Sequence, residues 1–188
     1  MAGRVVVGIS GSTGPVYGVR LLEVLRAQTD REIHLILSAG ARKTIEYEME
    51  RDPDEVVRLA HVAHDERNLG AAVASGTFLT DGMVVAPCSI KTLAAIANSD
   101  NDNLIARAAA VCLKERRPVV VLVRETPLHL GHLRLMERAT EAGAVILPPV
   151  PAFYHRPKTI ADLLDHTVMK ALDVLGLHLD LVPRWEGL

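Results

Sequence analysis

The chain has 188 residues, of which 49% are hydrophobic and 23% charged, and its formal net charge is -2 at pH 7. This length and balance predict one globular domain over residues 1–188, and they provide no basic field for nucleic acid. Cys88 and Cys112 form no paired motif, and no apolar run approaches the roughly 20 residues of a membrane span. We therefore expect a soluble, cytoplasmic protein that binds no membrane.

Five short runs rich in valine and isoleucine predict strands, because continuous apolarity is typical of strands covered on both faces. They occupy residues 4–10, 32–37, 82–87, 118–123 and 144–149. Helical patterns cover Val16–Gln28, Ala41–Glu50, Leu69–Ala74, Ile90–Ala97, Asn103–Arg116, Leu130–Ala142 and Ile160–Leu175. This alternation predicts an α/β fold with a central parallel sheet flanked by helices, whose ligands bind beyond the carboxyl ends of the strands.

The first predicted strand runs into a glycine turn, in which Gly8, Gly11 and Gly14 are three residues apart and Pro15 follows. Free N–H groups where such a turn enters a helix favour an anion, although a turn that only needs positive φ would look the same. The spacing is not that of a dinucleotide or triphosphate loop, and the second strand ends at Ser38 without a carboxylate. A phosphate ligand other than NAD is favoured.

Two further strand ends carry polar residues. Ser89, Lys91 and Thr92 follow the third strand, where they indicate either an anion site or a plain serine cap. Arg124 and Glu125 follow the fourth, as a functional charged pair or a structural salt bridge.

Cations and candidate metal ligands occur elsewhere in the chain. Arg107 and Lys114 are seven residues apart, so they share a helix face that either converges on one anion or is simply solvated. The run from Asp100 to Asn103 lacks the glycine and glutamate of a calcium loop and predicts a helix-capping turn. The histidine pairs 61/64 and 129/132 lack a zinc motif, so we expect no metal.

Several segments together resemble the UbiX-type flavin prenyltransferases, also known as phenylacrylic acid decarboxylase-like flavoproteins. They include GISGSTGPVYGVRLL, ASGTFLTDGMVVAPCSIKTLAAIA and PPVPAFYHRP, and the likeness runs in register from Arg4 to the tail. The resemblance implies a three-layer, flavodoxin-like Rossmann fold, a dodecamer and no metal. It further implies transfer of a dimethylallyl group from dimethylallyl phosphate to N5 and C6 of reduced FMN. The product, prenylated FMN, would serve UbiD-type decarboxylases, including the one in ubiquinone biosynthesis.

The resemblance also assigns residues by position. FMN contacts match Gly11, Ser12, Thr13, Ser38, Ser89, Ile90, Lys91, Thr92 and Arg124. Contacts to the prenyl phosphate match Tyr154 and Lys170, with Arg107, Lys114 and Arg124 as further positive charge. Catalytic positions match Glu48, Thr13, Lys114, Glu125 and Trp185. The last of these lies in a tail, residues 176–188, that we expect to pack on a neighbouring subunit.

The chemistry explains these residue types. Breaking an allylic C–O bond leaves phosphate and a delocalised cation, so the site needs fixed positive charge and a π-rich wall, here including Trp185. Glu48 is the candidate for proton transfer, although by itself it reads as a solvated helix acid.

The chain departs from the usual family pattern at two places. Ser12-Thr13 stands where Ala-Ser is usual, so Thr13 keeps a hydroxyl but gains a methyl group, and Lys170 replaces a common arginine. Two alternative functions are a cysteine-type flavin-dependent decarboxylase and a non-enzymatic FMN carrier. The first is disfavoured because PCSIKT replaces that family's PASANT-like segment; the second has no need of Tyr154, Lys170, Glu48 and Trp185 together.

Overall fold

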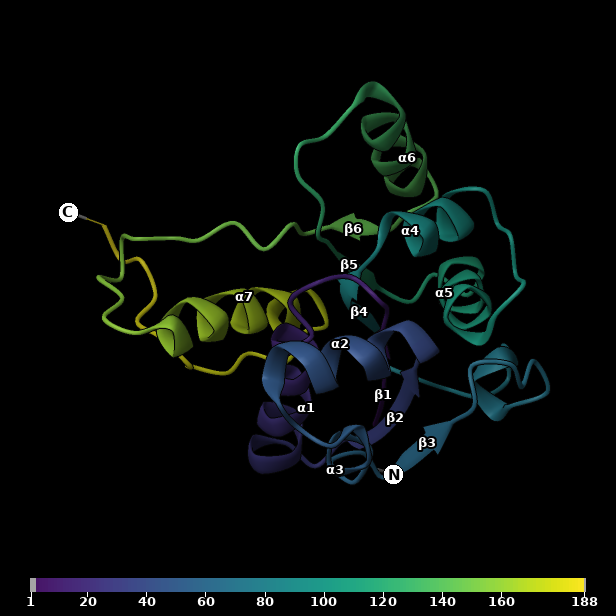
Figure 1. Ribbon diagram of the computed structural model, residues 1–188, viewed down its shortest axis with the longest axis horizontal. Helices are drawn as coiled ribbons and strands as arrows, with labels where there is room; N and C mark the ends of the chain where they lie inside the picture. Colours follow the sequence, from purple (N-terminus) through teal and green to yellow (C-terminus); the bar gives the residue numbers. More distant parts are fainter. Residues whose placement is uncertain (1–2, 188) are drawn as a thin grey trace.

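The computed structural model describes residues 3–187, and its centre is a sheet of six strands in the order β3-β2-β1-β4-β5-β6 (Figure 1). All neighbouring strands are parallel, which confirms the predicted sheet. The strands are β1 Arg4–Ile9, β2 Glu32–Leu37, β3 Val62–His64, β4 Gly82–Cys88, β5 Val119–Val123 and β6 Val145–Ile146. The five predicted strands are present, and β3 is an additional edge strand.

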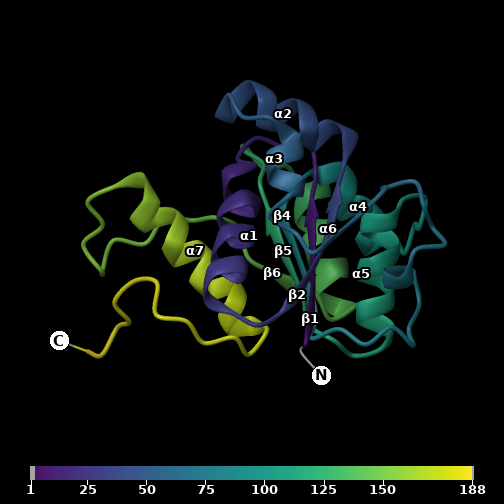
Figure 2. The same cartoon turned by 90° about the horizontal axis from the view of Figure 1, so that it is seen from below.

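Helices cover both faces of the sheet, so the predicted three layers are confirmed (Figure 2). One face carries α1 and α7, and the other carries α4, α5 and α6. The helices are α1 Val16–Gln28, α2 Ala39–Met49, α3 Pro53–Val57, α4 Ile90–Ala97, α5 Leu104–Lys114, α6 Leu130–Glu141 and α7 Ile160–Val174. Within residues 3–187 no helix is both long and apolar enough to cross a membrane.

The helix predicted at Leu69–Ala74 is wrong. That segment holds a turn and a single 3-10 turn, Ala72–Ala74. The Asn68 side chain accepts a hydrogen bond from the Gly70 N–H at 3.1 Å, so a local turn takes the place of the first helical bonds. The short helix α3 was not predicted, because five residues are too few for a recognisable period.

The alternating directions of strand side chains explain the continuous apolar runs. Val5 and Val7 of β1 pack with α1 and α7, whereas Val6 packs with the layer of α4 and α5. All three side chains are buried, so neither face of β1 can carry polar residues.

Two glycines set the close packing of helices on the sheet. A Cβ on Gly18 of α1 would collide with the Ala86 carbonyl oxygen of β4. Gly8 was expected in the glycine turn, but it lies inside β1, where a Cβ would meet Ile105 of α5 and Met83 at 3.2 Å. Both glycines therefore admit a neighbouring element rather than a ligand.

Candidate active site

The carboxyl ends of β1, β2, β4 and β5 meet along one edge of the sheet. Ile9 pairs with Leu37, and Cys88 pairs with Val123, so the segments after these strands lie side by side. A cavity of about 550 Å³ opens here, and a second of about 290 Å³ lies beside β5. The first is lined by Ser10, Gly11, Ser38, Ala39, Gly40, Glu66, Arg67, Ser89, Lys91, Thr92, Asp102, Asn103 and Ile105.

The glycine turn is held against α2 by backbone contact and by one carboxylate. A Cβ on Gly11 would lie 2.9 Å from the Gly40 Cα, so the two backbones touch where neither residue has a side chain. The Gly14 N–H donates to Glu48 Oε2 at 2.8 Å, and Gly14 has a φ of +88°. The positive φ is needed at Gly14, whereas Gly11 borders the cavity, so the two predicted roles of the turn fall on different glycines.

Two serines cap the helices that start at this edge. Ser38 accepts from the Ala41 N–H at 3.0 Å at the start of α2, and Ser89 accepts from the Thr92 N–H at 3.3 Å at the start of α4. Ser89 is therefore the serine cap that was one of its two predicted roles. A cap satisfies one of the free N–H groups of a helix start, so the others remain to attract an anion.

Ser10 joins the two central turns and was not predicted. Its side chain is 1% exposed, and its Oγ donates to the Pro87 carbonyl oxygen at 2.9 Å and accepts from the Ser89 N–H at 2.7 Å. The available signal was a hydroxyl directly after a buried strand, a position that a water-exposed turn does not explain.

The first cavity fits FMN in the chemistry of its lining. The hydroxyls of Ser38, Ser89 and Thr92 line it beside the backbone of Gly11. Serine and threonine hydroxyls, helix-start N–H groups and Lys91 are the donors that a phosphate and a ribityl chain require.

The second cavity brings Thr13, Arg124 and Glu125 together with Tyr17 and the prolines 148 and 149. The Arg124 N–H donates to the Cys88 carbonyl oxygen at 3.1 Å, which fixes the segment after β5 beside that after β4. Burial raises the pKa of Tyr17, and the nearby Arg124 guanidinium partly opposes that rise. No ion pair joins Arg124 to Glu125 within the described chain, so the structural salt bridge is wrong.

Arg107 and Lys114 lie at opposite ends of α5. Arg107 is in the first turn, next to Asn103 and Ile105 of the first cavity, and Lys114 is the last residue. Seven residues of helix span about 10 Å, and the Lys114 ammonium pairs with Glu115 near Gly76. Within one chain the two cations do not converge on one anion, because the helix carries Lys114 away from the edge.

Tyr154, Lys170 and Trp185 belong to another part of the molecule. The segment between β6 and α7 extends away from the sheet in both views (Figures 1 and 2). Tyr154 lies on this segment, and its ring meets the Trp185 ring edge-on, with the two ring centroids 5.9 Å apart. Lys170 lies on α7. These residues do not line either cavity of their own chain.

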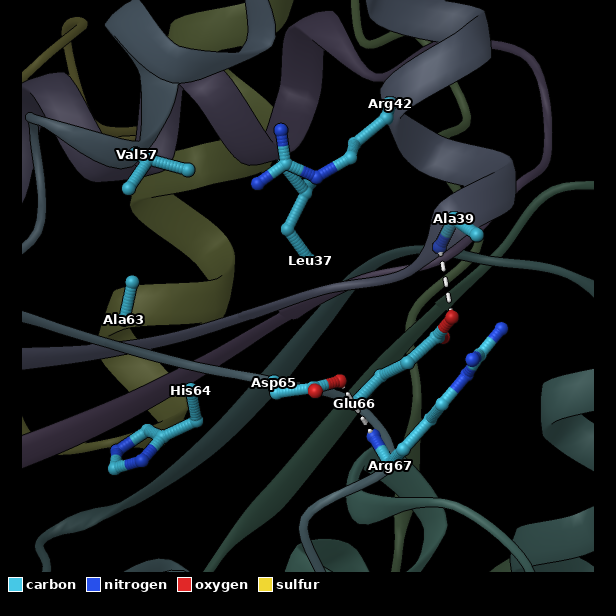
Figure 3. Close-up of a pocket in the computed structure, with 9 residues that line it drawn as sticks. All are labelled: Leu37, Ala39, Arg42, Val57, Ala63, His64, Asp65, Glu66 and Arg67. Carbon is cyan, nitrogen blue, oxygen red and sulfur yellow. Dashed lines mark hydrogen bonds between the residues drawn. The ribbon is translucent and has the colours of Figure 1, made fainter.

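Glu66 and Arg67, which follow β3, were missed. Glu66 Oε1 accepts from the Ala39 N–H at 3.0 Å, and its carbonyl oxygen accepts from the Leu104 N–H at 2.7 Å, so one residue bridges the starts of α2 and α5. Both residues also line a neighbouring cavity of about 460 Å³ that contains Arg42 and His64 (Figure 3). No apolar run marks β3, so nothing in the sequence placed this segment at the edge.

Several of the candidate metal ligands make other hydrogen bonds. His61 Nδ1 accepts from the Ile33 N–H at 2.9 Å, and His129 caps α6 through the Gly131 N–H. Asn103 caps α5, as predicted for a helix-capping turn. Among the residues described, no cluster of three or more histidine, cysteine or carboxylate side chains is placed to hold a metal.

Comparison with known proteins places the chain in a family. The flavoprotein family model matches residues 2–170. The flavin prenyltransferase UbiX of Escherichia coli K12 is 56% identical over 186 residues, covering 98% of each chain. The chain belongs to the UbiX family of flavin prenyltransferases. This identity confirms the resemblance found in the sequence and the FMN expectation that came with it.

Two solved structures of the family are also similar. A UbiX structure, AnUbiX (PadA1), in complex with FMN and dimethylallyl pyrophosphate is 46% identical and superposes with a TM-score of 0.97 over 100% of both chains. A dodecameric FMN-dependent UbiX-like decarboxylase from Escherichia coli O157:H7 is 43% identical, with a TM-score of 0.93 over 98% of this chain and 100% of that one. The three layers and the carboxyl edge are therefore those of UbiX proteins.

Proposed function

We propose that this chain joins a dimethylallyl group from dimethylallyl phosphate to N5 and C6 of reduced FMN, and so releases phosphate and prenylated FMN. The observation that carries the proposal is the match over both full chains to a UbiX structure holding FMN and dimethylallyl pyrophosphate. The lining of the edge cavity agrees with a flavin mononucleotide, because its donors suit one phosphate and a chain of hydroxyls.

Residues of the first cavity would hold the flavin. Gly11, Ser38, Ser89, Lys91 and Thr92 line it and offer backbone N–H groups, hydroxyls and one ammonium for phosphate and ribityl oxygens, and we propose that the adjacent Ser12 and Ile90 add backbone N–H groups. When bound, reduced FMN supplies the nucleophilic atoms of the transfer. Thr13 and Arg124 border the second cavity, which we assign to the reacting end of the flavin and to the prenyl group.

Charge and π faces would stabilise the bond-breaking step. The allylic C–O bond breaks and its electrons leave with phosphate, so Arg124, Lys170 and Arg107 stabilise the leaving group as fixed cations. Tyr154 and Trp185 face the carbon fragment with aromatic rings, which attract a delocalised cation. We propose a monophosphate substrate; the pyrophosphate in the related structure makes the diphosphate the second arm of the test.

The carboxylates of Glu48 and Glu125 would accept and donate protons during the reaction. Bond formation at C6 releases a proton, and the departing phosphate can take one up. Glu48 of α2 reaches the glycine turn, with Oε2 at 2.8 Å from the Gly14 nitrogen, and Glu125 lines the second cavity. We assign Glu48 to the C6 proton, because it is fixed beside Thr13, and Glu125 to orientation of the phosphate and its proton.

Neighbouring copies would complete each site. Lys114 and the segment carrying Tyr154 lie away from the cavities of their own chain, so their proposed roles require an oligomer. The Escherichia coli relative is described as dodecameric, and we propose the same closed assembly here. The part of the tail up to Val182 packs on its own chain, and we propose that a neighbour meets the exposed residues 183–187 beyond it.

The product would pass to a UbiD-type decarboxylase, including one in ubiquinone biosynthesis. Both cysteines are free and buried, which agrees with a reducing compartment, and we place the reaction in the cytoplasm.

One experiment tests the reaction. The purified protein is incubated without oxygen with reduced FMN, EDTA and either dimethylallyl phosphate or the diphosphate, and the flavin is weighed by mass spectrometry. We expect a gain of one five-carbon prenyl unit with the monophosphate. A flavin of unchanged mass with both substrates would refute the transferase and favour an FMN carrier. Activity that disappears with EDTA would refute phosphate binding by side chains alone.

A further inference from the structure

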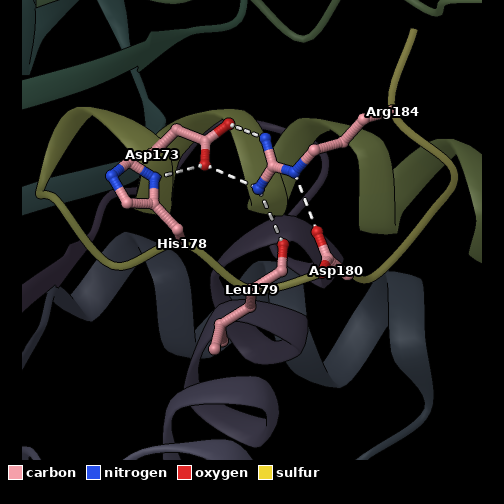
Figure 4. Close-up of polar contacts among 5 residues, drawn as sticks. All are labelled: Asp173, His178, Leu179, Asp180 and Arg184. Carbon is pink, nitrogen blue, oxygen red and sulfur yellow. Dashed lines mark hydrogen bonds and ion pairs between the residues drawn. The ribbon is translucent and has the colours of Figure 1, made fainter. Parts of the chain in front are cut away.

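The end of the chain is tied to α7 by a single arginine (Figure 4). Both terminal nitrogens of Arg184 donate to the Asp173 carboxylate at 2.9 Å, one to each oxygen. Arg184 Nε donates to Asp180 at 2.8 Å, and Nη2 also donates to the Leu179 carbonyl oxygen at 3.0 Å. The guanidinium thus makes four contacts in a two-pronged geometry that lysine cannot reproduce.

Asp173 is a firm anchor for this contact. It lies in the last turn of α7, its side chain is 14% exposed, and it also accepts from His178 Nδ1 at 3.1 Å. The hydrogen bond from Arg184 lowers the pKa of Asp173, so the carboxylate stays charged at neutral pH. A largely buried helix side chain therefore receives the exposed end of the tail.

Apolar packing holds the tail only as far as Val182. Leu177, Leu179 and Leu181 pack against the core, and Val182 is buried. The residues from Pro183 to Gly187 are exposed. Over that stretch the contacts of Arg184 are the polar contacts that the described structure provides.

The neighbouring residue, Trp185, lies in an aromatic cluster with Tyr154, His155 and His166. The Tyr154 hydroxyl lies 3.0 Å from His166 Nε2, and the rings of His155 and His166 stack at 5.2 Å. The Trp185 ring meets that of Tyr154 edge-on, yet 55% of the Trp185 side chain is exposed. Contact with one ring is too little to hold an exposed tryptophan in one position.

We propose that Arg184 is a positioning residue, whose ion pair with Asp173 holds Trp185 against Tyr154 and so assembles the prenyl-binding wall within one chain. The assignment of that wall to the prenyl group rests on the proposed function. The position of Trp185 does not, because it follows from the contacts of the tail. Arg184 itself touches neither cavity.

The chain has a built-in reporter for the test, since Trp185 is its single tryptophan. In the full-length protein we would measure the emission maximum, acrylamide quenching and time-resolved anisotropy of Trp185. We expect Arg184→Gln to shift the emission to longer wavelength, increase quenching about twofold and add a fast component to the anisotropy decay. Asp173→Asn removes the partner of Arg184 on α7, so it should change the Trp185 signals in the same way. This variant provides the test if Arg184→Gln does not fold.

The matched control is Arg31→Gln. It removes another arginine–aspartate ion pair, with Arg31 Nε 2.9 Å from Asp81, at the opposite end of the sheet. This variant should leave the Trp185 signals unchanged. Wild-type signals in both Arg184→Gln and Asp173→Asn would overturn the proposal, as would equal changes in the control.

Kinetics provide the second readout. We expect Arg184→Gln to keep its FMN content while kcat/KM for dimethylallyl phosphate falls about tenfold, mostly through KM, and Arg184→Lys to recover only part of it. Full activity with a loosened Trp185 would overturn the role in prenyl binding. If the wild type itself makes no prenylated FMN, the proposed function fails, while the fluorescence still decides whether Arg184 positions Trp185.

Discussion

Replacing Ser10 with alanine should weaken the junction between the two central turns. The substitution removes the acceptor of the Ser89 N–H and one of two donors to the Pro87 carbonyl oxygen, which keeps the Ser10 N–H at 3.2 Å. The cost therefore falls on the half-buried Ser89 N–H, and a donor left unsatisfied away from water costs about 1–3 kcal/mol. We expect a loss of about 2 kcal/mol in the free energy of unfolding.

Urea unfolding at one fixed protein concentration measures this loss, with the FMN dissociation constant as a second observable. Because Ser89 starts α4, we expect FMN to bind about tenfold more weakly, equivalent to about 1.4 kcal/mol. Ser75→Ala removes an exposed hydroxyl pair, 2.9 Å from Thr77, and should stay within about 0.5 kcal/mol of wild type. A Ser10→Ala protein as stable as Ser75→Ala would refute the reasoning.

Three further predictions concern the same edge and the sheet beneath it. Glu48→Gln should keep FMN, because an amide oxygen can also accept from the Gly14 N–H, yet slow prenylation about 100-fold in a single-turnover assay; loss of FMN would make Glu48 structural. Gly11→Ala should purify with little FMN, since its Cβ would press on the backbone of α2, whereas Gly70→Ala, with its nearest contact at 3.4 Å, should keep it. Burial lowers the pKa of His34 below its usual 6.5, so the folded state prefers the neutral ring. Stability is then full above pH about 6.5 and falls as the pH drops through the folded pKa. Thermal melts at pH about 7.5 and 5.5 should show this fall, and it should shrink in His34→Gln.

The strand ends could be predicted because a strand buried on both faces is a continuous apolar run, and that run stops where the strand ends. A run such as 118–123 is apolar on both faces, and Arg124 follows it at once, so strand and edge residue are found together. The serine that starts α4 was found for the same reason, whereas Ser38 was placed at a strand end and not recognised as the cap of α2. Local sequence thus predicted five of the six strands, the Ser89 and Asn103 caps and the turn that contains Gly11 and Gly14.

The contacts that depend on tertiary structure could not be predicted from the sequence. The strand β3 has only three residues, two of them exposed, so no apolar pattern marks it in the sequence. Glu66, which follows β3 and bridges α2 and α5, could therefore not be predicted. The shared helix face of Arg107 and Lys114 was inferred rightly, but their separation along the axis was not weighed. Periodicity shows which face of a helix a side chain occupies, but it does not show which end of the helix lies near a ligand.

The absence of a side chain at Gly18 couples the packing of α1 to the carboxyl edge of the sheet. Helix α1 rests directly on the Ala86 carbonyl oxygen, and the same peptide segment leads through Pro87 to Ser10 and Ser89. A side chain at position 18 would act as a wedge, pushing the helix outward at one end and shifting the β4 turn at the other. A substitution that loosens the contact between Gly18 and Ala86 should therefore also shift Ser10 and Ser89 at the carboxyl edge.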